Sequence, residues 1–132
     1  MAINMIEPLK IFDSKAATGS TKAYYVQDYQ HIFAQFASSG TANYTMKFQI
    51  SNSDAAPDFS AAASKTNPRS YIQVKELITN TAIDGSTGIT AAWADAVRNF
   101  EINTNGQRWF GATITAYAAG SIDLVLTAKN NQ

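Results

Sequence analysis

The chain lacks several of the residues on which enzyme and metal chemistry depend. None of its 132 residues is a cysteine, and His31 is its single histidine. Without cysteine there are no disulfides, no thiolate metal ligands and no cysteine nucleophile, so the core must hold by packing alone. One histidine does not supply the usual ligand set of a zinc site. We therefore predict no metal and no cofactor, and we give His31 no catalytic role.

An excess of charge and a long apolar run are also missing. Ten basic residues balance ten acidic ones, so no electropositive field gathers a phosphate backbone. No apolar run approaches the ~18 residues needed to span a bilayer. The N-terminal segment is interrupted by Glu7 and Pro8 and does not have the pattern of a signal peptide. We expect a soluble protein made in the cytoplasm, with no nucleic-acid or membrane partner.

Carboxylates are few and scattered. Asp54, Asp58 and Asp84 fall in segments rich in turn residues, where a calcium loop is conceivable. Their spacing matches no EF-hand, and the simpler interpretation is that they form turns. No pair of carboxyls identifies itself for glycoside hydrolysis, and no glycine-rich loop predicts a phosphate site. The sequence therefore predicts a protein that is not an enzyme.

What the chain does have is a regular alternation of apolar and polar side chains. In residues 108–117, Phe110, Ala112 and Ile114 fall on one face of an extended segment, and residues 121–127 repeat the pattern after a break at 118–120. We interpret these two segments as a β-hairpin. Similar texture predicts further strands at residues 23–26, 29–36, 44–51 and 71–78, with Ser38-Ser-Gly40 ending the second of them.

The connections are less regular. Residues 55–68 predict either a helical turn near Pro57 or a loop with a short strand around Phe59, and we favour the loop. Residues 84–88 read as a turn because they are rich in residues that tolerate positive φ.

The segment before the last strands is ambiguous. Trp93, Val97 and Phe100 have helical spacing, whereas residues 98–102 also alternate as a strand does. After it, residues 103–107 predict a hairpin loop with Asn105-Gly106 as its tight turn.

About eight short strands without helices between them predict an all-β antiparallel β-sandwich, with the jelly roll as the form we favour. Residues 21–132 form this single domain, and residues 1–20 form an N-terminal arm or an ordinary first strand, with equal weight on each. The arm is too apolar for a free tail, so we expect it to lie against its own body or a neighbour. In the strand at 108–117, Trp109 and Phe110 point to opposite faces, so one of the two rings must lie outside the main core. We predict that this ring is Trp109 and that it contacts a partner. The residues predicted to bind a partner are Ile3, Met5, Ile6, Leu9, Ile11, Phe12 and Trp109.

The order of these pieces resembles the small tailed-bacteriophage virion proteins of β-sandwich type. The resemblance covers residues 44–126: a strand ending in Ser51-Asn-Ser-Asp54, an Arg-aromatic strand from Arg108, and Gly120-Ser121 leading into the last strand. It implies a capsid decoration or cement protein that forms a homotrimer and binds the major capsid protein on the outer capsid surface. The alternative is a fibre-associated or carbohydrate-binding β-sandwich module, for which the aromatic residues would provide a sugar-stacking surface.

Overall fold

The computed structural model describes residues 5–94 and 97–129, apart from the side chains of residues 5–7, 39–41, 91–94 and 129. All regular structure in this part of the chain is β, and all strand pairs are antiparallel, so the predicted fold class is confirmed. The strands are β1 (Met5–Lys15), β2 (Gly19–Ser20), β3 (Tyr24–Tyr25), β4 (His31–Ser51), β5 (Ser70–Tyr71), β6 (Val74–Glu76), β7 (Thr81–Ile83), β8 (Ile89–Ala94), β9 (Val97–Asn103) and β10 (Trp109–Lys129).

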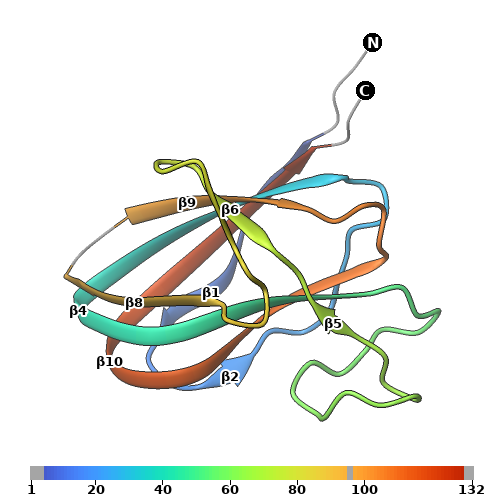
Figure 1. Cartoon of the computed structure of the whole chain (residues 1–132), viewed down its shortest axis with the longest axis horizontal. Coiled ribbons are helices and arrows are strands. Elements are labelled where there is room, and N and C mark those ends of the chain that lie inside the picture. Colours follow the sequence, from blue (N-terminus) through green and yellow to red (C-terminus); the bar gives the residue numbers. More distant parts are fainter. Residues whose placement is uncertain (1–4, 95–96, 130–132) are drawn as a thin grey trace.

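Two long strands organise the fold. β4 and β10 have 21 residues each and pair along their whole length, from Trp109 opposite Ser51 to Lys129 opposite His31. The register shifts three times between Ile114 and Ser121, and such bulges bend a strand. Figure 1 shows both strands as long curved ribbons that turn together at one end of the molecule. The sheet therefore curls on itself into two facing layers.

We call the two halves of the curled sheet the first and the second layer. The first layer has the order β1-β10-β4-β9-β6-β7 and uses residues 121–129 of β10 and 31–38 of β4. The second layer uses residues 109–117 of β10 and 41–51 of β4, with β2 and β3 on one side and β5 and β8 on the other. The sandwich is thus built from one continuous sheet.

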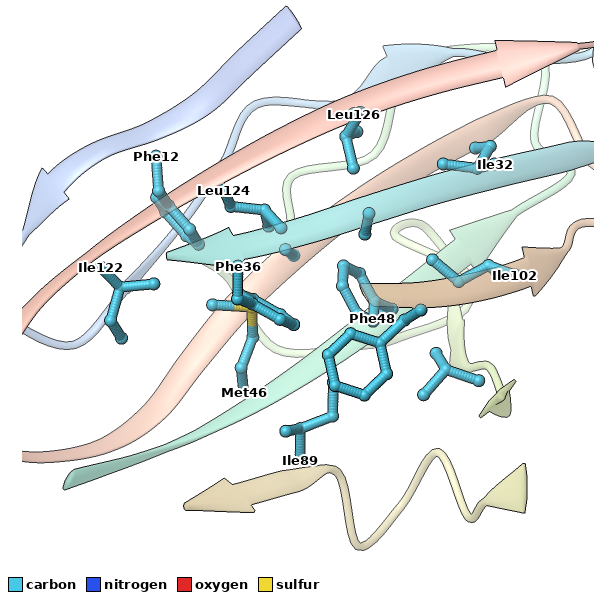
Figure 2. Packing of buried hydrophobic residues seen from close by; sticks show 14 of the residues in the cluster. Phe12, Ile32, Phe36, Met46, Phe48, Ile89, Ile102, Ile122, Leu124 and Leu126 are labelled. Atoms are coloured by element: carbon cyan, nitrogen blue, oxygen red, sulfur yellow. The ribbon is translucent and has the colours of Figure 1, made fainter. Parts of the chain in front are cut away.

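The core lies between the layers and takes one face of each long strand. Phe36 of the first layer lies 6.1 Å from Phe48 of the second and 5.0 Å from Phe100 of β9, measured between ring centroids. Figure 2 shows Phe36 and Phe48 filling the space between strands together with Met46 and Leu124. Each large apolar side chain that is fully buried contributes about 1.5–3 kcal/mol. Even-numbered positions supply the buried hydrophobic residues of both long strands: Ile32, Ala34, Phe36, Ala42, Tyr44, Met46, Phe48, Phe110, Ala112, Ile114, Ile122, Leu124, Leu126 and Ala128.

The predicted hairpin over residues 108–127 is wrong. Both halves belong to β10, and each pairs with β4 rather than with the other. The break is the bulged bend itself, where Gly120 adopts a φ of 83° and its carbonyl accepts a hydrogen bond from the Tyr117 hydroxyl. Ser38-Ser-Gly40 likewise lies inside β4 instead of ending a strand. On both sides of each break, the even-numbered side chains face the core, because a single strand bends around a single core.

The Asn105-Gly106 turn forms, but it does not close a hairpin. Both residues have positive φ, 51° and 77°, and the Gln107 amide donates to the Thr104 carbonyl at 3.0 Å. These are the conformations that an Asn-Gly pair favours. β9, which precedes the turn, pairs with β4 and β6, and β10, which follows it, pairs with β1 to β4. The turn therefore carries the chain from the first layer to the second, and the predicted hairpin is wrong.

The remaining connections settle the open alternatives. The helical interpretation of the segment around Val97 is wrong, because its described residues form β8 and β9. Residues 55–68 are a loop, as favoured, but the predicted short strand around Phe59 does not form, and the loop's isolated bridge joins Ser64 and Asn67. The predicted strand at 71–78 is divided, since β5 pairs with β4 in the second layer and β6 pairs with β9 in the first.

Candidate docking surface

The outward side of the first layer carries an open apolar groove. Odd-numbered positions of β4 and β10 point away from the core here, and Phe33, Val125 and Thr127 line the groove. Pro8 of β1 and Leu77, which follows β6, line it as well. Its volume is about 410 Å³. The groove therefore lies across the first layer, over a floor of strand residues.

A second depression continues the groove, because Leu77 and Asn99 line both. Leu77 is 41% exposed and Val97 is 59% exposed, and Ile78 beside them is exposed as well. Large apolar side chains that cluster in water mark contact surfaces. We call this surface the open face and define it by its apolar members, Pro8, Phe33, Leu77, Ile78, Val97 and Val125.

An ion pair at the edge of the core fixes the position of Leu77. Arg98 Nε donates to Glu76 Oε2 at 2.5 Å, and Arg98 Nη2 donates to Glu76 Oε1 at 2.6 Å. Bidentate pairs of this kind are short, strong and geometrically specific. The Leu77 amide donates to the Asn99 carbonyl at 3.0 Å directly beside the pair. Burial raises the pKa of the neighbouring Tyr44 phenol. The positive charge of Arg98 lowers this pKa, and the negative charge of Glu76 raises it, but both effects are smaller than that of burial.

Charged side chains stand at the margin of the open face. Lys10 Nζ lies 3.7 Å from Asp123 Oδ2 and 3.7 Å from Asp13 Oδ1. Exposed pairs of this kind contribute about 0–1 kcal/mol to stability. An apolar centre with a polar rim is the usual anatomy of a protein–protein interface.

The outward side of the second layer is different, because the loop of residues 52–69 covers it. Phe59 in this loop is only 3% exposed, and its ring lies against Gly111 of β10. A Cβ at Gly111 would come within 2.4 Å of Phe59 Cδ2, so the glycine makes room for the ring. Ser20 Oγ donates to the Phe59 carbonyl at 3.0 Å, and Gln49 Nε2 beneath the loop donates to Thr113 Oγ1 at 2.8 Å. We call this surface the covered face.

The loop is held by its own polar groups. Arg69 donates to the carbonyls of Asp58 and Ala61, and its guanidinium lies 5.9 Å from the Phe59 ring centroid. The Asp58 carboxylate accepts hydrogen bonds from the Ser60 hydroxyl and amide, which lower its pKa.

The other two aspartates of the calcium alternative are also engaged locally. The Asp84 carboxylate accepts hydrogen bonds from the Ser86 hydroxyl and amide, which lower its pKa. Asp54 pairs with Arg108 at 2.5 Å between Oδ1 and Nη1.

Most of the residues predicted to bind a partner through an arm belong to β1, the first-strand alternative. Leu9 lies opposite Leu126 and is 40% exposed, whereas Phe12 lies opposite Leu124 and is 5% exposed. Ile11 is half-buried against the core. The backbones of Met5 and Ile6 pair with Lys129 and Ala128, while their side chains, and all of Ile3, lie outside the described part of the structure. Phe12 belongs to the chain's own core, whereas Leu9, among the described β1 side chains of this set, is accessible to a partner.

Trp109 lies on the outward side of the second layer, away from the open face. Its indole Nε1 donates to the Ser53 carbonyl at 3.0 Å, and its ring meets Tyr25 edge to face, with a centroid distance of 5.3 Å and an interplanar angle of 76°. Tyr25 is exposed. The pair provides a small aromatic contact surface but no coplanar platform for stacking a sugar.

Sequence reasoning missed the open face. The signal was present, because Phe33 and Val125 are apolar residues at outward positions of strands whose inward positions are already apolar. A strand that is apolar on both faces is typical of a sheet covered on both sides. Leu77 and Val97 had no such signal, since only the crossing of β6 to β9 places them beside the groove.

The described residues show neither a metal site nor a membrane-spanning helix. Among the residues that the structure describes, no group of three or more His, Cys, Asp and Glu side chains is placed to hold a metal ion. His31 sits half-buried at the start of β4, opposite Asn103 and Lys129. The described residues also contain no helix with the length and apolar character needed to cross a bilayer.

The fold and its surfaces define an antiparallel β-sandwich made from one curled sheet, and the comparisons with known proteins show the same architecture. No protein-family model and no curated protein matches the chain. The crystal structure of the SPBc2 prophage-derived protein YomS is similar, with a TM-score of 0.69 and 6% identity over 98% of this chain and 96% of that one. The crystal structure of the PBSX exported protein XepA is similar with a TM-score of 0.72 and 13% identity, over 98% of this chain and 39% of XepA. At these identities the likeness shows the fold alone.

Proposed function

We propose that this chain is a structural protein of a tailed-phage virion, bound to the outer surface of the capsid as a decoration or cement protein. The observation that carries the proposal is the open face, where the side chains of Phe33, Leu77 and Val125 line a groove of about 410 Å³. One of the two similar folds belongs to a protein whose name places its origin in a prophage, which supports a phage origin for this chain. The proposal assigns the chain adhesion and no catalysis.

The partner that we propose for the open face is the major capsid protein. Each apolar side chain of the face that becomes fully buried would contribute about 1.5–3 kcal/mol. Ile78 and Val97 have the most to gain, because they are the most exposed of these side chains in the free chain, and Leu77 follows them. A balanced net charge suits contact with a protein shell better than contact with nucleic acid.

Self-association as a homotrimer is the second part of the proposal. Three linked copies would bind neighbouring capsid subunits together, so that modest contacts at each open face add up to very slow release. Light scattering on the purified chain measures the assembly state, and a mass near three times 14.3 kDa is expected.

Co-sedimentation with undecorated capsids tests the proposal. The variant Leu77→Asp/Val97→Asp places two charges on the open face at exposed positions, so the fold should survive while capsid binding falls at least about 100-fold, since a desolvated unpaired charge costs several kcal/mol. The matched control is Thr115→Asp, an exposed β-strand position of the second layer. Equal binding by the two variants, or no binding by the unaltered chain, would refute the proposed role.

The fibre-associated alternative keeps one observation in its favour, the exposed Tyr25 ring beside Trp109. Under that alternative Tyr25→Ala would weaken attachment to the virion, and the two aspartate substitutions on the open face would not. The same co-sedimentation assay, run with purified fibres, separates the two.

A further inference from the structure

A polar groove beside the open face has a composition that the proposed capsid role does not use. It lies where the chain crosses from β5 to β6, next to β9 and the turn at residues 104–107, and its volume is about 410 Å³. Its polar lining consists of Gln73, Lys75, Glu101, Asn103 and Asn105. Ligand sites of this size combine an apolar surface with a few convergent polar groups.

The groove has an aliphatic base under polar tips. Ile72 is half-buried and supplies the accessible aliphatic surface, Val74 is buried and belongs to the core, and Gln73, Lys75 and the two asparagines reach solvent. A sugar ring has this same division, with C–H groups on its face and hydroxyls around its edge. An amide side chain carries both a donor and an acceptor, so it can bind two neighbouring hydroxyls at once.

The single cation and the single anion of the groove face each other across two strands. Lys75 of β6 lies opposite Glu101 of β9 in the register, and no ion pair joins these two described side chains. Each therefore keeps its hydrogen-bonding capacity for a third molecule. Because one positive charge balances one negative charge, the groove favours a neutral ligand over a phosphate or a carboxylate.

The far wall is preorganised. Thr104 is fully buried, its amide donates to the Gln30 carbonyl at 2.9 Å, and its hydroxyl donates to the Tyr29 carbonyl at 2.9 Å. The Asn105 amide donates to Asn103 Oδ1 at 2.9 Å, which orients the Asn103 side chain and leaves its NH₂ group for a ligand. A wall that is already ordered reduces the entropy lost on binding.

We infer that this groove binds a neutral saccharide, with Gln73, Asn103 and Asn105 bonding its hydroxyls and Lys75 and Glu101 bracketing it. The inference does not depend on capsid attachment, since it uses residues outside the open face. It also differs from a sugar-stacking site at Trp109, because none of the described residues that line the groove is aromatic.

Titration calorimetry on the full chain tests the inference with a fixed set of probes. These are neutral tetrasaccharides of glucose, galactose, mannose and N-acetylglucosamine, and sialyllactose as an anionic comparison. At least one neutral probe should bind with a Kd of about 1 mM or tighter, and sialyllactose should bind at least about tenfold more weakly. Gln73→Ala and Glu101→Gln should each weaken the binding about tenfold, since each removes or neutralises one hydrogen-bonding partner.

The matched control is Asn52→Ala, which removes an exposed amide outside the groove and should leave the affinity unchanged. Circular dichroism and the unfolding midpoint of each variant establish that the fold is intact. The inference is overturned when no neutral probe binds, when sialyllactose binds as well as they do, or when binding survives both groove substitutions. Gln73→Ala should still bind capsids, and Leu77→Asp/Val97→Asp should still bind the saccharide. These two cross-measurements separate a failure of the saccharide site from a failure of the capsid role.

Discussion

The two outward faces of this sandwich are built by the same two strands, yet one is covered and the other is bare. On the covered face, Gly111 leaves space that the Phe59 ring fills. On the open face, Phe33 and Val125 occupy the outward positions and line a groove. Among the described residues, no loop comparable to residues 52–69 lies across that groove.

The two faces differ in which side chains are buried: polar side chains are buried under the loop, whereas apolar side chains are exposed on the open face. Beneath the loop, Gln49 and Ser51 are buried, and each is hydrogen-bonded, to Thr113 and to the Pro68 carbonyl. Buried polar groups are tolerated when they are paired in this way. Leu77 and Val97 are apolar and remain in water at a cost of about 25 cal/mol per Å² of exposed apolar surface. A partner that covers Leu77 and Val97 would remove this cost, and the recovered free energy would favour its binding.

The largest effect should come from removing the residue that covers one face. Phe59→Ala deletes a nearly buried ring and should lower the free energy of unfolding by about 3 kcal/mol, as large-to-small changes of buried aromatics do. Guanidinium denaturation measures it. The control is Tyr71→Ala, which removes an exposed ring of the same layer that lies 4.9 Å from Lys47 Nζ, and should cost about 1 kcal/mol or less. Equal losses would mean that Phe59 does not hold the loop to the sheet.

A smaller effect should follow from filling the space that the ring occupies. Gly111→Ala puts a methyl group where the Phe59 ring lies and should cost about 2 kcal/mol, within the range for overpacking. In the Phe59→Ala background the same change should cost almost nothing, so the double-mutant cycle should show a coupling of at least about 1 kcal/mol. If the costs of the two substitutions simply add, the destabilisation by Gly111→Ala does not come from a clash with the Phe59 ring.

The smallest effect on stability belongs to the open face. Leu77→Ser and Val97→Ser should each change the free energy of unfolding by about 0.5 kcal/mol or less, because both side chains are already substantially exposed. The same denaturation measurement applies. A loss above about 2 kcal/mol for either variant would show that the open face is part of the chain's own packing, and the comparison between the faces would disappear.

Much of the fold class could be predicted from residue patterns, and much of the topology could not. Phe110, Ala112 and Ile114 were placed on one apolar face of a strand, and all three are buried in the core. The two predicted hairpins failed because a glycine-rich break marks a change of direction without saying how sharp the change is. Gly120 bends one strand through a bulge, whereas Asn105-Gly106 reverses the chain between layers.

The candidate site shows the same limit. Leu77 and Asn99 are far apart in sequence, and they line one groove only because β6 pairs with β9. The polar groove likewise needs Lys75 and Glu101 to fall opposite each other. Phe12 was predicted to bind a partner as part of the arm, yet its pairing with Leu124 brings it into the chain's own core.

The sequence by itself determined that this protein is made of strands, which side of each strand is apolar, and that no cysteine or histidine cluster is present for chemistry. Those properties are local, because successive side chains of an extended chain point to opposite sides. Tertiary structure alone decided that two long strands bend into both layers, that a loop closes over one outward face, and that the other face stays open. Strand partners and coverage depend on contacts between residues far apart in the chain, which local alternation does not encode.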